Sequence, residues 1–213
     1  MKPKRIVFCD FDGTITANET FVSMLKEFAP DSSAQLLPLI YNRQLTLKAG
    51  VRQMLESIPS HCYQQIIDRT ASQRIRLGLK EFLEFLNSLN IPFVVISGGL
   101  TDMVKAVLQH QLLMTQVTAI YAAEIDSSSE YLRVYSDLEN DIELVAKVQA
   151  MAKYSATETI AIGDSVTDIN MALQADLVFA RDRLIEYLEA EKKPYIRWHN
   201  FLDVRDYLAA CWN

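Results

Sequence analysis

The sequence predicts an α/β protein in which a parallel β-sheet is covered by helices. Three apolar runs, at residues 6–9, 92–96 and 159–162, are rich in β-branched or aromatic side chains and are bounded by turn residues. Short runs of this composition favour buried parallel strands over helices. Helical periodicity follows the second and the third run, so strand and helix alternate along the chain, as they do in α/β proteins.

The segment that follows the first strand interrupts this alternation. From about residue 19 to residue 75, apolar side chains recur at spacings of three to four, which indicates short amphipathic helices. We therefore predict an α/β core made of residues 1–17 and 77–213 and an inserted helical domain of residues 18–76. A lid above a site excludes water and selects the substrate, so we expect the inserted segment to act as a cap.

The rest of the predicted core contains a hairpin and further strand–helix units. Residues 117–123 and 131–135 flank a serine-rich turn and predict a β-hairpin. A helix over about residues 142–154 is expected to lead into the strand at 159–162. A strand at residues 177–180 and two helices near the C-terminus complete the expected fold.

Composition excludes several classes of function. Half of the 213 residues are hydrophobic and the net charge is -6, which indicates a packed core without the basic surface of a nucleic-acid-binding protein. No apolar run approaches the roughly 20 residues that span a bilayer, and the run near the start is too short for a signal peptide. The three cysteines show no CxxC spacing and predict neither a disulfide framework nor a zinc site. These features favour a cytoplasmic protein that binds neither nucleic acid nor a membrane.

Two aspartates directly follow the first predicted strand. Asp10 and Asp12 stand at the C-terminal end of that strand, where open α/β sheets bind ligands, and Gly13 turns the chain away. Because side chains alternate along a strand, we expect both carboxylates on the same side. Two negative charges this close need a cation or a shared proton to relieve their repulsion. Taken alone, the motif also suits an ordinary strand-to-turn junction.

The other two strands end in polar residues as well. Ser97, Gly98 and Gly99 follow the second strand, and Asp164 and Asp168 follow the third. The C-terminal ends of parallel strands meet at one edge of a sheet, so three strand ends present polar groups to a common mouth. This repetition favours a functional site over simple turn chemistry.

The three junctions resemble motifs I, II and IV of the haloacid dehalogenase superfamily of phosphatases. The resemblance implies a Rossmann-like core with an inserted cap and a reaction through an aspartyl-phosphate. It makes Asp10 the nucleophile, and makes Asp12 the group that protonates the leaving oxygen and then activates water. The implied Mg²⁺ ligands are Asp10, the main-chain carbonyl of Asp12, and Asp164. Asp168 is expected to stabilise the arrangement of the metal ligands. Its negative charge is also the one preferred at a helix N-terminus.

The same resemblance implies the groups that bind the phosphate. Ser97 would donate to the phosphoryl group, helped by backbone N–H groups around Gly98 and Gly99. The superfamily also needs a lysine that neutralises the phosphate and the nucleophile. Lys147 is the best-placed candidate and Lys153 the second. A lysine on a helix is more often simply solvated, which is the alternative for both.

Several blocks of sequence resemble one subgroup of this superfamily, the 2-hydroxy-3-keto-5-methylthiopentenyl-1-phosphate phosphatases of methionine salvage. The blocks are residues 8–16, 26–30, 45–54, 91–99, 162–168 and 179–182. The resemblance covers nearly the whole chain and implies a small phosphorylated metabolite as the substrate. One stretch departs from the pattern, because the subgroup carries a longer, cysteine-rich segment ahead of its lysine, and residues 124–145 contain no cysteine here.

Phosphoserine phosphatases are the nearest alternative class. Glu19 stands where those enzymes keep a glutamate for the amino group of the substrate, and Arg52 is a candidate partner for a carboxylate, which needs a cation when buried. Against this alternative, Met54 stands where their carboxylate-binding arginine is expected, and Thr167 replaces an asparagine. Glu19 and Arg52 are therefore the candidates for contact with the non-phosphate part of the substrate. A non-catalytic phosphate-binding module is a further alternative, although such a module would be expected to lose at least one of the motif aspartates.

Three apolar residues of the inserted segment bear on the choice of substrate. Met24, Phe28 and Met54 would suit an uncharged, thioether-bearing tail better than a zwitterion. Their helical spacing gives another explanation, which is that they form the core of the inserted segment itself; for Met24 and Phe28 this is the commoner situation.

Overall fold

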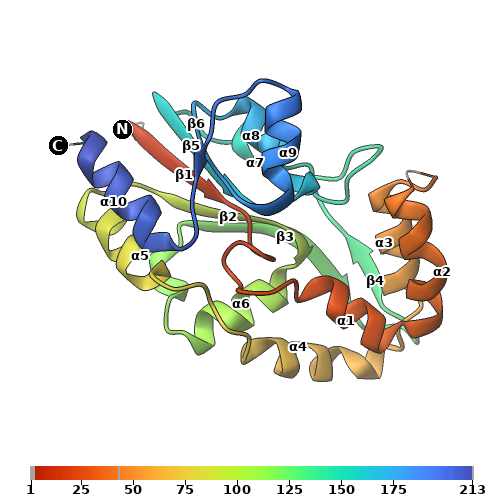
Figure 1. Cartoon of the computed structure of the whole chain (residues 1–213). Coiled ribbons are helices and arrows are strands. Elements are labelled where there is room, and N and C mark those ends of the chain that lie inside the picture. The colour runs from red at the N-terminus through yellow and green to blue at the C-terminus, as the bar shows by residue number, and fades with distance from the viewer. Residues whose placement is uncertain (1–2, 43, 213) are drawn as a thin grey trace.

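The computed structural model describes residues 3–42 and 44–212 and contains a seven-stranded sheet between two layers of helices (Figure 1). The strand order is β4-β3-β2-β1-β5-β6-β7, and every neighbouring pair is parallel except β3 and β4. The strands are β1 (Arg5–Cys9), β2 (Phe93–Leu100), β3 (Ala119–Asp126), β4 (Arg133–Tyr135), β5 (Glu158–Gly163), β6 (Leu177–Ala180) and β7 (Ile196–Arg197). The predicted α/β class with a parallel sheet is confirmed.

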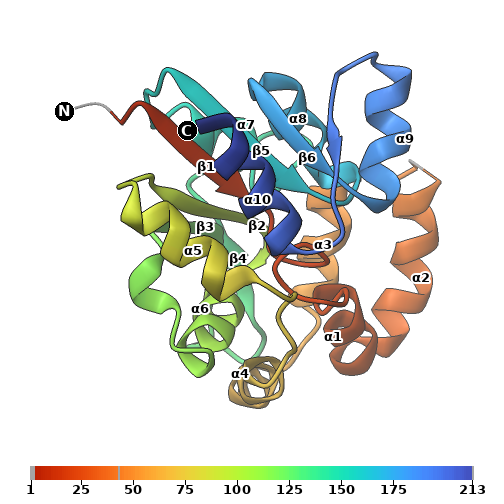
Figure 2. The same cartoon turned by 60° about the vertical axis from the view of Figure 1, so that its left-hand side comes forward.

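Alternating side chains on β1 explain the two helical layers. Ile6 and Phe8 join one hydrophobic cluster, whereas Val7 and Cys9 join a second on the opposite face of the sheet, and all four are fully buried. A parallel strand covered on both faces must be apolar throughout, which explains the uninterrupted run seen in the sequence. The first cluster includes α7 (Lys147–Met151), α8 (Ile169–Gln174) and α9 (Asp182–Ala190), and the second includes α5 (Leu79–Ser88), α6 (Thr101–His110) and α10 (Phe201–Trp212) (Figure 2).

In the described part of the chain between β1 and α5 there are four α-helices and a short 3-10 helix (Ser60–Cys62), in line with the helical periodicity of the sequence. The α-helices are α1 (Phe21–Phe28), α2 (Pro30–Tyr41), α3 (Leu47–Leu55) and α4 (Tyr63–Ala71). Figure 1 places them together at the end of the molecule away from the two termini. Thr16 and Ile75 form an antiparallel bridge, so the segments that enter and leave this group of helices are paired. The division into a core of residues 1–17 and 77–213 and a cap of residues 18–76 stays a prediction, and its ranges include positions 1, 2, 43 and 213, which lie outside the described residues.

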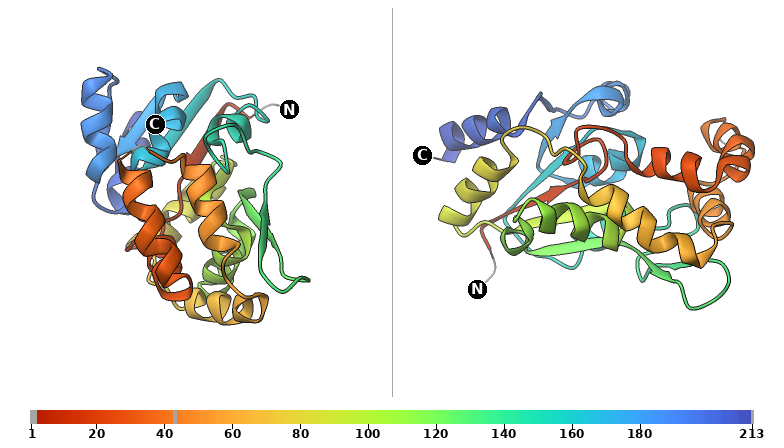
Figure 3. Two further views of the ribbon diagram at one scale, coloured as in Figure 1. Left: turned by 90° about the vertical axis from the view of Figure 1, so that its right-hand side faces the viewer. Right: turned by 90° about the horizontal axis from the view of Figure 1, so that it is seen from below.

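Helices of the group α1–α4 contact both a helix of the second layer and the edge of the sheet. Helix α4 packs along α6, and the hydroxyl of Tyr63 donates a hydrogen bond of 2.9 Å to Asp102. Helix α3 lies between α2 and β4, as the left view of Figure 3 shows. The structure therefore ties these helices both to the second helical layer and to the edge strand.

The hairpin prediction is confirmed, and one strand is longer than the sequence suggests. Strands β3 and β4 pair in antiparallel fashion. Strand β2 continues to Leu100, although its register with β3 shifts between Ile96 and Leu100. The predicted strand stops near this irregularity, because Ser97 and the two following glycines have the composition of a turn.

The predicted helix over residues 142–154 is wrong, since α7 spans only Lys147–Met151. The preceding chain closes on itself through a hydrogen bond from Ala146 N to Leu138 O at 2.8 Å. The side chain of Asn140 accepts hydrogen bonds from two backbone N–H groups that follow it, which is a local alternative to helix. Residues 144–147 are all buried, which a helix with one solvent-facing side does not allow.

The described part of the chain holds no helix whose length and apolar character would let it cross a membrane.

Candidate active site

Strand register brings the three polar junctions to one edge of the sheet. Cys9, the last residue of β1, pairs with Val95 of β2 on one side and with Ile162 of β5 on the other. Ser97 and Asp164 each lie two positions beyond these partners, so they flank the chain as it leaves β1. The common mouth predicted from three separate strand ends is thus present in the structure.

Lys147 lies between two buried carboxylates. Its Nζ is 2.5 Å from Asp10 Oδ1 and 2.6 Å from Asp168 Oδ1, and the lysine side chain is only 1% exposed. Burial by itself would lower the pKa of Lys147, but the two carboxylates raise that pKa above its ordinary value, so the ammonium stays charged. A charged ammonium here holds the Asp10 carboxylate in place and offsets part of its charge.

The second lysine candidate lies elsewhere. Lys153 is exposed, and its Nζ sits 4.8 Å from the centre of the Tyr121 ring. The geometry therefore brings Lys147, and not Lys153, to Asp10. The sequence alone did not decide between the two lysines. Both were expected on one helix, and the neighbouring residues do not show which lysine is buried.

Asp164 completes a cluster of three buried carboxylates. Carboxyl oxygens of Asp10, Asp164 and Asp168 lie within 4.8 Å of one another. Burial, and after it the charge of Asp168, raises the pKa of Asp164 to about 7, even though Thr14 donates a hydrogen bond of 2.7 Å to it. One lysine does not balance three carboxylates, so the cluster carries excess negative charge.

A divalent cation fits this cluster. Asp10 Oδ2 is buried and has no hydrogen-bond partner among the described residues. Buried charges require a partner or a metal ion, and hard divalent cations prefer carboxylate and carbonyl oxygens. Asp10 and Asp164 can supply such oxygens, and a bound cation would lower the pKa of Asp164 against the effects of burial and of Asp168.

Asp168 uses both of its carboxylate oxygens on protein partners. Oδ1 binds Lys147, and Oδ2 accepts hydrogen bonds from the backbone N of Asp164 at 2.9 Å and of Ser165 at 3.0 Å. Gly163 allows this packing, since a Cβ there would lie 2.6 Å from Asp168 Cγ. Asp168 thus orients both the lysine and the junction that carries Asp164.

The turn after Asp12 is fixed by a distant arginine. Gly13 has a φ of 82°, which favours glycine, and a Cβ at this position would lie 2.6 Å from Asp164 Oδ2. Arg76 donates hydrogen bonds to the backbone oxygens of Gly13, Thr14 and Thr16. Sequence reasoning missed Arg76, because no local pattern marks a side chain that binds carbonyl groups about sixty positions away.

Asp12 has different surroundings from Asp10. Its carboxylate accepts hydrogen bonds from Thr20 N at 2.5 Å, from the Thr20 hydroxyl, and from Phe21 N at 3.1 Å. Burial raises the pKa of Asp12, and these hydrogen bonds oppose that change. We expected strand alternation to place both carboxylates on the same side. Strand β1 ends at Cys9, however, so this alternation does not extend to Asp10 and Asp12. Sequence reasoning also missed Thr20, although a threonine just before a helical stripe is a known start signal.

The Ser97 junction is buried and leaves room above it. Ser97 is 1% exposed, and its Oγ accepts a hydrogen bond of 3.0 Å from Gly99 N, which leaves its own proton for another acceptor. A Cβ at Gly98 would meet nothing within 4 Å, whereas one at Gly99 would touch Phe21. The open space at Gly98 suits the approach of a ligand to the backbone.

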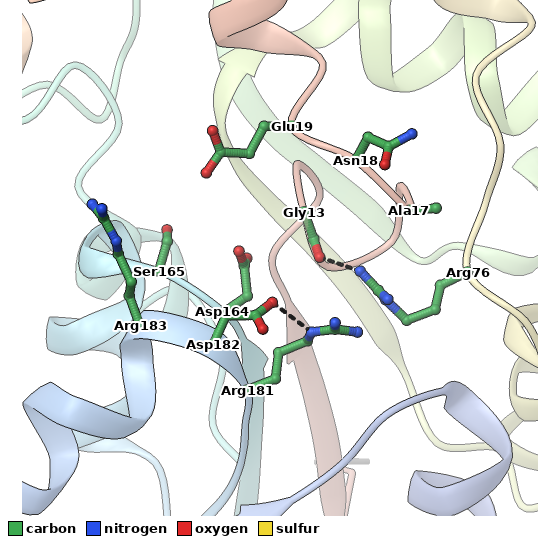
Figure 4. Close-up of a pocket in the computed structure, with 10 residues that line it drawn as sticks. All are labelled: Gly13, Ala17, Asn18, Glu19, Arg76, Asp164, Ser165, Arg181, Asp182 and Arg183. Atoms are coloured by element: carbon green, nitrogen blue, oxygen red, sulfur yellow. Dashed lines mark hydrogen bonds and ion pairs between the residues drawn. The ribbon is translucent and has the colours of Figure 1, made fainter.

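A cavity of about 250 Å³ opens beside Asp164 (Figure 4). Its lining residues are Gly13, Ala17, Asn18, Glu19, Arg76, Asp164, Ser165, Arg181, Asp182 and Arg183. Glu19 is thus placed near the predicted site. Arg181 and Arg183 were not predicted as site residues. The sequence around them offered a resemblance over residues 179–182 but no motif of catalytic residues at a strand end.

Arg52 and Met54 do not line this cavity. Arg52 Nη2 lies 2.5 Å from Glu139 Oε2, so its charge is directed to the segment that precedes α7. Met54 has no exposed surface and belongs to the first hydrophobic cluster together with Met24. The structure therefore supports the packing explanation for these methionines and does not bring Arg52 to the predicted mouth.

The fold and this site define a class of α/β hydrolases with paired aspartates after the first strand. The chain belongs to the haloacid dehalogenase-like hydrolases, because that family matches residues 7–173. The resemblance stated from the motifs is therefore confirmed, and the chain is a hydrolase of this family.

Curated relatives match over nearly the full length. A 2-hydroxy-3-keto-5-methylthiopentenyl-1-phosphate phosphatase of Microcystis aeruginosa (strain NIES-843 / IAM M-2473) is 62% identical over 204 residues, which cover 96% of this chain and 97% of the relative. A protein of the same name from Bacillus cereus (strain ATCC 10987 / NRS 248) is 38% identical and covers 95% of this chain and 94% of the relative. The subgroup resemblance is thus supported by relatives whose match extends over nearly the whole chain.

Solved structures share the fold. A structure described as a phospho-aspartyl intermediate analogue of phosphoserine phosphatase superposes with a TM-score of 0.69 at 19% identity, over 97% of this chain and 99% of that one. A substrate-bound phosphoserine phosphatase gives the same TM-score at 18% identity and the same coverage. At this identity the likeness shows a common fold and says nothing about the substrate.

Proposed function

We propose that this chain is a Mg²⁺-dependent phosphatase that hydrolyses 2-hydroxy-3-keto-5-methylthiopentenyl-1-phosphate through an aspartyl-phosphate. One observation carries the mechanism, namely that the charged Lys147 holds Asp10 inside a cluster of buried carboxylates. The substrate is supported by the relatives of that name, one of which is 62% identical.

In the first step, the Asp10 carboxylate attacks phosphorus and the bond between phosphorus and the substrate oxygen breaks. The Asp12 carboxyl donates its proton to that oxygen as the alcohol leaves. Burial raises the pKa of Asp12, which favours the protonated form that this step needs. Lys147 stays bound to Asp10 and offsets the negative charge that gathers there.

In the second step, water attacks the phosphorus of the aspartyl-phosphate. Asp12, now a carboxylate, takes a proton from this water. The bond between phosphorus and the Asp10 oxygen then breaks, which releases inorganic phosphate and restores the Asp10 carboxylate. Thr20 and Phe21 hold the Asp12 carboxylate in both steps, because their three hydrogen bonds fix its position.

The remaining site residues bind the metal and the phosphate. Asp10, the main-chain carbonyl of Asp12, and Asp164 would hold Mg²⁺, with Asp168 supporting them. When bound, Mg²⁺ shields the charges of nucleophile and phosphate from each other. The Ser97 hydroxyl and the backbone N–H groups at Gly98 and Gly99 would bind the phosphoryl oxygens.

Recognition of the rest of the substrate falls to the helices outside the sheet. We propose that residues 18–76 act as a cap, since the strand ends supply only phosphate chemistry and binding energy away from the reacting centre must come from elsewhere. Glu19, which lines the cavity beside Asp164, is the polar candidate. We place the protein in the cytoplasm, where the small phosphorylated metabolites that it would act on are formed.

The test is phosphate release from a panel of phosphomonoesters in the presence of Mg²⁺. The panel contains the methylthio-ketose phosphate, phosphoserine and an aryl phosphate, and Asp10→Asn serves as the inactive control. The proposal requires the highest kcat/KM for the methylthio-ketose phosphate. A higher kcat/KM for phosphoserine would show that the proposed substrate is wrong and that phosphoserine takes its place. Binding without any phosphate release would indicate a non-catalytic module.

A further inference from the structure

An irregular loop leads directly to Lys147. We call residues 138–146 the lysine loop. The hydrogen bond from Ala146 N to Leu138 O, at 2.8 Å, closes the loop at its base, and Lys147 is the next residue. No helix or strand lies within the loop, which is held by its own hydrogen bonds at Asn140 and at its base and by contacts with the rest of the protein.

Helix α3 supplies polar contacts to the lysine loop. The backbone N of Lys48 donates to Ile142 O at 2.9 Å, and its Nζ donates to Asn140 O at 2.7 Å. Arg52 Nη2 lies 2.5 Å from Glu139 Oε2, and Lys48 Nζ lies 3.5 Å from Glu139 Oε1. Two basic residues one helical turn apart on α3 therefore share one acidic residue of the loop.

Buried apolar residues of both segments belong to one hydrophobic cluster. Leu138, Leu144 and Val145 of the loop are each at most 6% exposed and belong to the hydrophobic cluster that contains Val51 and Leu55 of α3. The loop thus has a buried side that packs into this cluster and an acidic residue that pairs with Lys48 and Arg52.

We propose that the docking of α3 on the lysine loop positions Lys147 for catalysis, with Glu139 and Arg52 as positioning residues. The inference rests on the proposed function, in which Lys147 holds the nucleophile. It also gives Arg52 a role that differs from substrate contact. Through this docking, the helices expected to select the substrate would also set the lysine beside Asp10.

The expected effect is moderate. Arg52 and Glu139 are each about one-third exposed, so solvent screens their attraction, and the buried apolar residues of both segments remain when the pair is broken. A small displacement of a catalytic group nevertheless lowers the rate steeply. We expect Glu139→Gln and Arg52→Met each to lower kcat by about three- to tenfold.

The decisive comparison uses an aryl phosphate, which has no methylthio tail for the inserted helices to bind. If the pair acts through Lys147, kcat falls for the aryl phosphate as well as for the preferred substrate, and the double variant is no worse than either single one. Arg69→Met is the matched control, because it breaks an exposed ion pair with Glu27 inside the same group of helices, and it should leave kcat unchanged.

Hydrogen exchange gives a readout that does not depend on turnover. Amides of residues 138–147 should exchange faster in Glu139→Gln than in the wild type, while those of β1 and β5 stay protected. Wild-type kcat together with unchanged exchange in Glu139→Gln would overturn the proposal. A second result would also overturn it: Arg52→Met raises KM for the tail-bearing substrate alone, and Glu139→Gln has no effect. That result would make Arg52 a substrate contact.

The two proposals fail in different ways. If the wild type releases no phosphate from any phosphomonoester, the proposed function is wrong, and the exchange experiment still decides whether α3 orders the lysine loop. If the wild type is active and the pair variants equal it in kcat and exchange, only the positioning role is wrong.

Discussion

Asp10 and Asp12 stand two positions apart in one motif, yet their surroundings differ in kind. Asp10 is paired with the charged ammonium of Lys147, whereas Asp12 accepts hydrogen bonds from the neutral donors of Thr16, Thr20 and Phe21. Burial and the charge of Asp168 raise the pKa of Asp10, and the Lys147 ammonium opposes that rise. Burial also raises the pKa of Asp12, but there the opposing groups are neutral hydrogen-bond donors. The difference suits one aspartate to attack phosphorus and the other to carry a proton, as in other sites where paired carboxylates take opposite roles.

The largest loss of activity is expected from Asp10→Asn. A neutral amide is a poor nucleophile, so kcat should fall by about 10⁵-fold or more, in line with the loss of catalytic nucleophiles in other hydrolases. The loss should be the same for alkyl and aryl phosphates, measured as phosphate release. Near-normal turnover by the purified variant on any substrate would rule out Asp10 as the nucleophile.

Asp12→Asn should lower the rate by about 10²- to 10⁴-fold for alkyl phosphates, because general acid–base catalysis is lost. An aryl leaving group needs no proton, so the first step should survive with that substrate. We expect a rapid burst of phenol and a phosphorylated Asp10 peptide, detected by mass spectrometry. Equal losses for alkyl and aryl phosphates, with no trapped phosphate, would contradict the division of roles.

Metal binding should also set Asp12 apart, this time from Asp164. Mg²⁺ at about 100 times its Kd should stabilise the wild type by about 2.7 kcal/mol, or about 5–10 °C in Tm. Asp164→Asn should lose most of this shift, whereas Asp12→Asn should keep it, since only the main-chain carbonyl of Asp12 is expected to bind Mg²⁺. Asp176→Asn, which alters an aspartate bonded to Thr159, is the control and should keep the shift. An Mg²⁺ shift that survives in Asp164→Asn would remove Asp164 from the ligand set.

The smallest expected effect is that of Thr20→Val. The variant loses one hydroxyl donor to Asp12 but keeps the backbone donors of Thr20 and Phe21. One hydrogen bond contributes about 1 kcal/mol, so kcat for alkyl phosphates should fall by about three- to tenfold. Thr20→Ser keeps the hydroxyl and should restore the rate. A Thr20→Val variant with unchanged kcat would show that the backbone donors alone hold Asp12.

Local pattern was enough to predict the strands and their polar ends. The apolar runs of β1, β2 and β5 are covered on both faces, which makes them continuous in sequence. Turn-type residues follow each run; after β1 and β5 they mark the end of the strand, whereas in β2 they mark the shift of register before Leu100. The C-terminal ends of parallel strands lie at one edge of the sheet. The sequence therefore predicted that Asp10, Ser97 and Asp164 lie near one another. The amphipathic spacing of α1–α4 likewise depends only on residues within each helix.

Tertiary contacts decided which charged groups act together. The choice of Lys147 over Lys153, the pairing of Arg52 with Glu139, and the binding of Arg76 to the Gly13 turn each join residues more than sixty positions apart. The lysine loop also departs from the predicted helix, because hydrogen bonds from Lys48 and the Asn140 turn bind backbone groups that a helix would pair internally. Periodicity reports what each element buries, whereas the partner of a buried charge is set by packing between elements, which no local window of sequence contains.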